Sequence, residues 1–148
     1  MGRSLRVLML GAVLVLVSAC SEGGTGTTQA PTADVVVRVV SGGEVLADWT
    51  LADLEASVGF TELTVDGDLQ SGPLLLDVLE ASGVGDWESG RVFGMGEGRV
   101  FEVALDIDSG EVDHGWILDV TNKGTLKLAS ANLPKDRWVR DVGEISFP

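Results

Sequence analysis

Residues 72–83 read Gly-Pro-Leu-Leu-Leu-Asp-Val-Leu-Glu-Ala-Ser-Gly, and this stretch predicts the clearest helix of the chain. Its apolar side chains recur at the three- and four-residue spacing that places them on one helix face. They are Leu75, Leu76, Val78 and Leu79. Gly83 follows at the C′ position, where glycine accepts the left-handed backbone conformation that ends many helices. We therefore expect a helix within 74–82 that buries one apolar face.

The segments around this helix predict strands and one further helix. Thr50 precedes Asp53 by three residues, which resembles a capping box and predicts a short helix over about 51–57. Alternating or β-branched runs between turn residues predict strands at 35–40, 44–49, 61–65, 68–70, 91–93, 99–106, 115–120, 125–130, 138–142 and 144–147, the last two as a final strand pair. Residues 34–148 suffice for one domain and not for two, so we predict a single, mainly β, α+β domain.

The N-terminus has the features of a lipoprotein signal peptide. Arg3 and Arg6 precede the apolar run Val7–Val17, and Val-Ser-Ala-Cys follows at 17–20. A basic start, a short apolar stretch and small residues before the cleavage site are typical of secretory signal peptides. The ending in Cys20 resembles the lipobox of bacterial lipoproteins. This resemblance implies a signal peptide over 1–19, a diacylglyceryl group on Cys20, and anchoring to a bacterial cell membrane on its extracytoplasmic side.

Two other membrane attachments fit the N-terminus less well. As a transmembrane helix, the eleven residues Val7–Val17 reach about half of the ~20 that a bilayer core requires. As an N-myristoylation signal, Met1-Gly2 lacks the Ser or Thr expected at the sixth position, which is Arg6. Residues 20–33 then form the lipidated N-terminus and a tether, because after Cys20 they contain no large apolar side chain that could be buried.

The charge of the chain excludes one class of partner. Cleavage after residue 19 removes two arginines, so the formal charge falls from −13 to −15. A surface of this sign repels nucleic acid and anionic lipid headgroups, which leaves the acyl chains of Cys20 to hold the protein on the bilayer. Cys20 is the sole cysteine, so its lipidation also excludes disulfides and cysteine nucleophiles.

Two motifs suggest ligand sites but fit ordinary loops better. Residues 94–98 read Gly-Met-Gly-Glu-Gly, with glycines at the wrong spacing for a dinucleotide loop and a strand following instead of a helix, so a hairpin connection is favoured. Residues 106–114 contain Asp106, Asp108, Glu111, Asp113 and His114, which could bind a hard cation such as Ca²⁺. The spacing departs from that of an EF-hand, and a solvated acidic loop is favoured.

No complete catalytic arrangement is present in the sequence, so no catalytic residue and no metal ligand is assigned. The serines lack the Gly-x-Ser-x-Gly context of a hydrolase nucleophile. Trp138 lies between Arg137 and Arg140, which could form an anion site; a strand edge whose arginines pair with nearby acids is the favoured interpretation. Each of the four tryptophans lies in or beside a predicted strand, so most are expected in the core or at its edge.

The order of these segments resembles a known family. Residues 51–54, 63–83 and 126–145 are similar to the molybdopterin-binding domain of sulfite-oxidase-type oxidoreductases in a short, exported form. The helix at 72–83 and the Arg-Trp-Val-Arg-Asp-Val strand at 137–142 carry most of the similarity. The resemblance implies the fold of that family, in which a cysteine before the Gly-Pro-Leu helix ligates molybdenum. Here 63–69 contains no cysteine, and Asp66 or Gly67 occupies the comparable place.

A carboxylate is a poor substitute for a soft thiolate ligand. We therefore expect a non-catalytic domain that binds a small ligand or a membrane-protein partner, with no cofactor. The alternative is a molybdopterin-binding oxidoreductase or redox accessory subunit, which predicts a deep pocket near Asp66 and Arg137–Arg140. A third interpretation is a cation-binding module at Asp106–Asp113.

Overall fold

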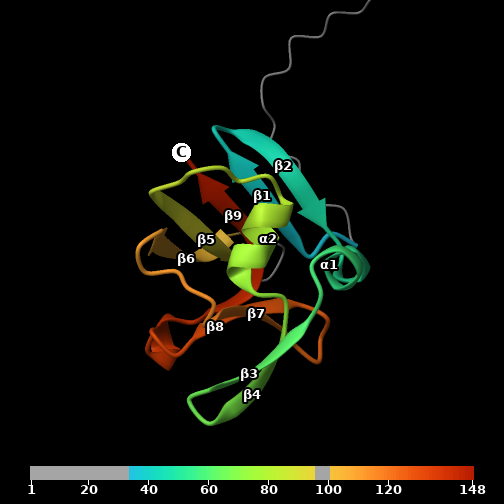
Figure 1. Ribbon diagram of the computed structural model, residues 1–148, viewed down its shortest axis with the longest axis vertical. Coiled ribbons are helices and arrows are strands. Elements are labelled where there is room, and N and C mark those ends of the chain that lie inside the picture. Colours follow the sequence, from blue (N-terminus) through green and yellow to red (C-terminus); the bar gives the residue numbers. More distant parts are fainter. Residues whose placement is uncertain (1–33, 96–100) are drawn as a thin grey trace, which may run out of the picture.

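The computed structural model describes residues 34–95 and 101–148, which form a mainly β domain with two short α-helices. The predicted α+β class is confirmed. The elements, shown in Figure 1, are β1 (Val37–Ser41), β2 (Glu44–Trp49), α1 (Leu51–Ser57), β3 (Thr61–Val65), β4 (Asp68–Gly72), α2 (Leu75–Ala81), β5 (Ser89–Met95), β6 (Phe101–Asp108), β7 (Trp116–Val120), β8 (Leu126–Ser130), the 3₁₀ turn η2 (Lys135–Arg137) and β9 (Val139–Phe147). None of the helices in these ranges is long and apolar enough to span a bilayer.

A seven-stranded mixed sheet organises the domain around β9. Along the order β2-β1-β9-β5-β6, β9 is parallel to β1 and antiparallel to β5, and it also pairs with β8 of the β7–β8 hairpin. The prediction of two final strands is therefore wrong, because residues 139–147 form one central strand. Asp141 and Gly143 resemble turn residues in the sequence. In the structure they instead shape an irregularity within the strand, with Asp141 at φ 48°.

Helix α2 lies across the sheet and closes the main core, as Figure 1 shows. Its buried side chains Leu75, Val78 and Leu79 belong to one cluster with apolar residues of β1, β5 and β9. Gly83 adopts φ 78° directly after the helix, which confirms the predicted C′ role. Ser82 Oγ donates to Val78 O at 2.7 Å and accepts from Trp49 Nε1 at 2.8 Å, so this end of α2 is joined to β2.

Helix α1 begins as the sequence predicts. Thr50 Oγ1 accepts a hydrogen bond from the backbone N–H of Asp53 at 3.1 Å and lies 2.7 Å from its carboxylate. This contact satisfies one of the backbone donors left free at a helix N-terminus. Leu54 is the helix residue that is fully buried, so α1 is held by one apolar anchor and its cap.

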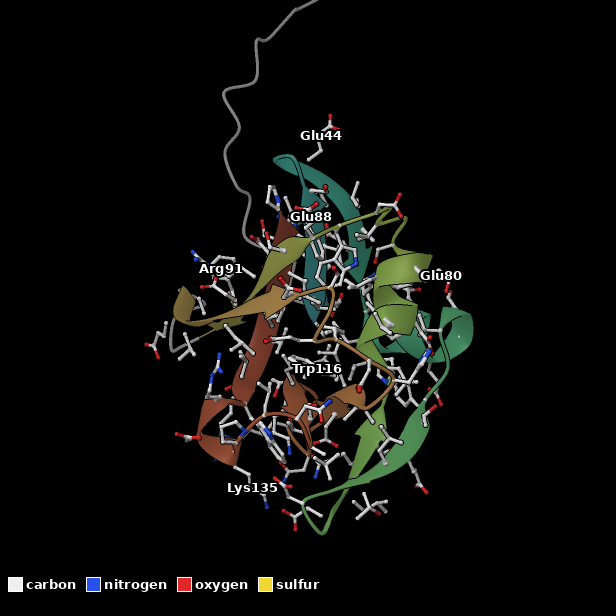
Figure 2. All side chains as sticks on the ribbon, turned by 60° about the vertical axis from the view of Figure 1, so that its left-hand side comes forward. Glu44, Glu80, Glu88, Arg91, Trp116 and Lys135 are labelled. Carbon is white, nitrogen blue, oxygen red and sulfur yellow. The ribbon has the colours of Figure 1, made fainter. Side chains whose placement is uncertain are left out.

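The tryptophans lie in the core and at its edge, as predicted. Trp116 and Trp49 are buried, with Trp116 near the centre of the domain in Figure 2, while the labelled acids Glu44 and Glu80 lie at its outline. Trp87 packs edge-on against Phe147 with ring centroids 5.1 Å apart. Trp138 is partly buried beside a second, smaller cluster that includes Val65 and Ile117.

The β3–β4 hairpin forms a separate two-stranded sheet that docks on β7. Leu118 N–H donates to Pro73 O at 2.9 Å, and Ser71 N–H donates to the Asp119 carboxylate at 2.8 Å. Near the hairpin tip, Lys135 Nζ contacts Asp68 at 2.8 Å, and this hydrogen bond and the lysine charge lower the pKa of Asp68. Backbone and side-chain contacts therefore both hold the hairpin.

Two charged residues lie side by side on β1 and β9. Arg38 is buried, pairs with Asp48 through Nε at 2.6 Å, and stands opposite Glu144 in the β1–β9 register. Burial raises the pKa of Glu144, and the positive charge of Arg38 offsets this only in part. The folded domain therefore binds the Glu144 proton more tightly than the unfolded chain does, so ionising Glu144 costs stability as pH rises through the carboxyl range.

Glu144→Gln is accordingly expected to raise the melting temperature at pH 7, because the neutral amide avoids the cost of a half-buried carboxylate. The gain should shrink as pH falls below about 4, where glutamate is itself protonated. Thermal unfolding followed by circular dichroism across pH 3–8 measures this, with the exposed Glu111→Gln as the matched control. An equal effect of Glu144→Gln at all pH values would contradict the assignment.

Candidate functional site

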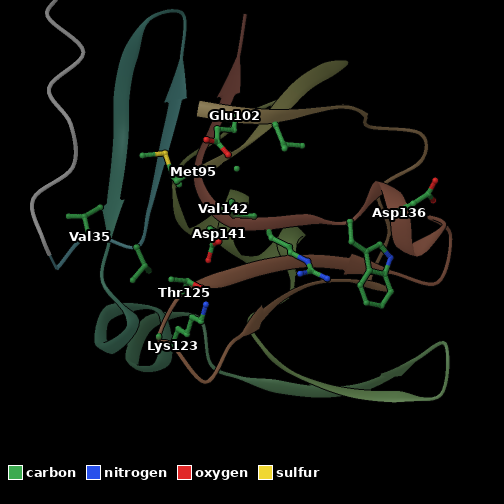
Figure 3. Close-up of a pocket in the computed structure, with 15 residues that line it drawn as sticks. Val35, Met95, Glu102, Lys123, Thr125, Asp136, Asp141 and Val142 are labelled. Carbon is green, nitrogen blue, oxygen red and sulfur yellow. The ribbon is translucent and has the colours of Figure 1, made fainter. Parts of the chain in front are cut away.

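A pocket of about 790 Å³ opens where β9 passes between β5 and β8. Figure 3 shows that its walls come from the residues before β1, from β5, β6 and β9, and from the β7–β8 turn. Its apolar side chains are Val35, Val36, Met95, Val103, Trp138 and Val142, and its charged ones are Glu102, Lys123, Asp136, Arg140 and Asp141. The volume is within the range of about 300–1,000 Å³ typical of small-molecule sites.

Irregular strand pairing creates this pocket. The β5–β9 register shifts between Phe93 and Gly94, and the β8–β9 register shifts between Leu126 and Leu128. Within the β8–β9 shift, which spans Val139 to Val142 on β9, Asp141 takes a left-handed conformation that is uncommon for a residue with a side chain. As a result Arg140 and Asp141 are both exposed, although consecutive strand residues normally point to opposite faces. Bulges often redirect side chains in this way next to functional sites.

Two glycines allow the strands to approach closely at this point. A Cβ on Gly94 would lie 2.6 Å from the Arg140 carbonyl oxygen, which is too close for any side chain. A Cβ on Gly143 would collide with the Met95 side chain, including its sulfur at 2.6 Å. Gly94 and Met95 therefore belong to β5, whose antiparallel pairing with β6 agrees with the predicted hairpin but moves its connection to after Met95; residues 96–98 of that motif lie outside the described residues.

The pocket carries charges of both signs that are not neutralised by ion pairs. In the described ranges 34–95 and 101–148, the ion pairs are Arg38–Asp48, Arg91–Asp106, Lys127–Asp119 and Lys135–Asp68. None of the five charged lining residues belongs to these pairs. Lys123 and Arg140 can therefore bind an anionic group, and Glu102 and Asp141 a cationic one.

Trp138 is held in place by polar and cationic contacts at the side of the pocket. Its Nε1 donates to the carbonyl oxygens of Ser130 and Leu133, at 3.2 Å each. The Nζ atoms of Lys127 and Lys135 lie 5.5 and 5.6 Å from its ring centroid, within cation–π range. The expected pairing of Arg137 and Arg140 with acids is wrong for the described part of the chain, and lysines surround the tryptophan instead.

The acidic segment 106–114 does not converge on one point. Asp106 binds Arg91 at 2.6 Å, Asp108 accepts from Gly110 N–H, and Asp113 accepts from Gly115 N–H and Asn132. Each of these three aspartates thus makes its own contact, and Glu111 and His114 are exposed. Across the described residues, no three His, Cys, Asp or Glu side chains are grouped so as to hold a metal ion.

The oxidoreductase alternative predicts one deep pocket near Asp66 and Arg137–Arg140, but Asp66 does not line the pocket. Arg140 lines the pocket, whereas Asp66 lies at the exposed β3–β4 turn with φ 51° and is absent from its walls. Cys20, the only thiol of the chain, lies outside the described residues. The donor set at the pocket therefore does not fit a molybdenum centre, because its lining residues supply carboxylates, cations and the Met95 thioether but no thiolate.

Sequence patterns indicate only part of the pocket. Trp138 and Arg140 belong to the possible anion site at 137–140, and Gly94 and Met95 to the glycine-rich motif at 94–98. One signal was available for Asp141: the adjacent polar residues in Val-Arg-Asp-Val at 139–142 break strand alternation, which indicates a bulge. Nothing in the local sequence links Lys123 or Glu102 to them, because tertiary pairing of β5, β8 and β9 brings these residues together.

No family model, curated protein or solved structure matches this chain.

Proposed function

We propose that the chain is an extracytoplasmic lipoprotein, anchored to a bacterial membrane through acylated Cys20, whose domain is a non-catalytic binding module. Its specific fold is proposed to resemble the molybdopterin-binding domain of sulfite-oxidase-type oxidoreductases. The single observation that carries the binding function is the pocket at the β9 irregularity, with its apolar walls and unpaired charges. The proposed ligand is a small molecule, with a membrane-protein partner as the other candidate and nucleic acid excluded by charge.

The position of the pocket supports a role close to the membrane. Val35 and Val36, which line it, stand at the start of the described domain and follow the proposed tether 20–33. A ligand-binding domain joined to the bilayer by a short tether can pass its ligand to, or receive it from, a membrane protein nearby. The apolar and charged groups of the pocket support binding, and they include no nucleophile paired with a base.

The non-catalytic assignment predicts that purified protein carries no stoichiometric molybdenum. Full-length chain produced in a host that makes molybdopterin should give substoichiometric metal by elemental analysis and no pterin fluorescence after oxidation, because the pocket offers no thiolate. A molybdenum enzyme from the same host, purified in parallel, is the positive control. One molybdenum per chain would refute the proposal and support the oxidoreductase alternative.

A further inference from the structure

We infer that the pocket recognises a small zwitterion with an apolar middle, of the size of a short apolar peptide. This inference rests on the proposed binding function and specifies its ligand. The carboxylate of the ligand would bind Lys123, and its ammonium group would bind Glu102, with Asp141 alongside the path between them and Arg140 as the second cation of the lining.

The positions of the charged residues support a ligand with two poles. In Figure 3, Glu102 lies beside Met95 at one end of the pocket, and Lys123 lies beside Thr125 at the opposite end. Asp141 and Val142 lie between these ends, while Asp136 lies apart from them, at the far side of the view. A cation and an anion at opposite ends of one pocket bind a molecule that carries complementary charges at its own two ends.

The walls between the two poles are apolar. In Figure 3, Val35 lies at one side of the pocket and Val142 nearer its middle, with Met95 above them in this view. Val103 on the edge strand β6 is 54% exposed, so it offers apolar surface that the described domain does not bury itself. Burying such surface against a ligand is favourable by about 25 cal/mol per Å². A fully polar zwitterion would leave this contribution unused.

The charge of the protein argues against ions of a single sign. An anion would approach a chain with a formal charge of −13, or −15 after cleavage, and would meet Glu102, Asp136 and Asp141 at the pocket. A cation would be attracted at long range but would meet Lys123 and Arg140. A molecule with no net charge avoids the long-range repulsion and can use both kinds of contact. The volume of about 790 Å³ leaves room for more than a single amino acid.

The test uses four forms of the tripeptide alanyl-valyl-alanine, titrated into the folded protein. The free peptide is the zwitterion, its C-terminal amide is a cation, its N-acetyl form is an anion, and the doubly blocked form is neutral. Binding is measured by calorimetry and by ¹⁹F NMR of 5-fluorotryptophan-labelled protein, in which the signal of Trp138 is assigned with Trp138→Phe. We expect the zwitterion to bind about tenfold more tightly than either singly blocked form and to shift the Trp138 signal.

Variants assign the two poles. Lys123→Gln should weaken binding of the zwitterion and of the N-acetyl peptide about tenfold and leave the amide unchanged. Glu102→Gln should weaken binding of the zwitterion and of the amide about tenfold and leave the N-acetyl peptide unchanged. Arg137→Gln and Glu111→Gln are matched controls, since both residues are exposed and neither lines the pocket. Equal binding of all four peptides would overturn the zwitterion inference and leave the binding function standing. Failure of all four to shift Trp138 would overturn the inference and remove support for this pocket as the binding site.

Discussion

Replacing Gly72 with alanine is expected to destabilise the domain by about 3 kcal/mol, because the added methyl group has no space. Gly72 ends β4, and a Cβ at this position would collide with the backbone carbonyl oxygen of Leu118, with the carbonyl carbon at 3.0 Å and Asp119 Cα at 3.3 Å. All three neighbours are backbone atoms of β7, so a change of side-chain rotamer does not relieve the collision.

The collision lies at the contact that holds the β3–β4 hairpin. To accept a methyl group, β4 must move away from β7, which lengthens the Pro73–Leu118 and Ser71–Asp119 hydrogen bonds. Leu118 is fully buried, so water entering the gap would meet core surface. We therefore expect a lower melting temperature together with faster amide exchange across β3, β4 and β7.

Gly85→Ala is the matched control for this prediction. A Cβ on Gly85 has no neighbour within 4 Å and its φ is not in the left-handed region, so alanine there should be neutral or slightly stabilising. Urea unfolding of both variants, with the midpoint and slope compared, measures the difference. Equal stability of the Gly72 and Gly85 variants would show that β4 and β7 are not packed as closely as described.

The elements with local signals could be predicted from the sequence. Helix α1 has Thr50 as its cap, and α2 has an apolar face ending at Gly83, so neither depends on distant residues for its recognition. The hairpins β1–β2, β3–β4 and β7–β8 likewise follow from turn residues between β-rich runs. Each of these patterns is contained within a short window of sequence.

Residues 139–147 could not be predicted in the same way, because the deciding contacts come from elsewhere in the chain. Asp141 and Gly143 favour a turn when only their neighbours are considered. Pairing with β1, β5 and β8 imposes a single strand, and the close approach of Met95 explains the glycine. The pocket depends on this same pairing, so it cannot be recognised when residues 139–147 are predicted as two separate strands.

Replacing Cys20 with serine is expected to abolish lipidation completely. A thioether to diacylglycerol requires a sulfur nucleophile, and Cys20 is the only one in the chain. Cells labelled with radioactive palmitate should incorporate label into the wild-type chain and none into Cys20→Ser. The variant should also retain residues 1–19, since the lipobox directs cleavage before a lipidated cysteine.

The physical basis of the anchor predicts where the two forms partition. Each buried methylene contributes about 0.8 kcal/mol, so two or more acyl chains hold a protein stably, whereas one chain binds only marginally. The wild-type chain should therefore enter the detergent phase in Triton X-114 partitioning. Ser18→Ala keeps a small residue before the cleavage site and should behave as wild type. Palmitate incorporation that survives in Cys20→Ser would refute Cys20 as the acylated residue. Absence of label from the wild-type chain would refute the anchor, and with it the placement of the pocket beside a membrane.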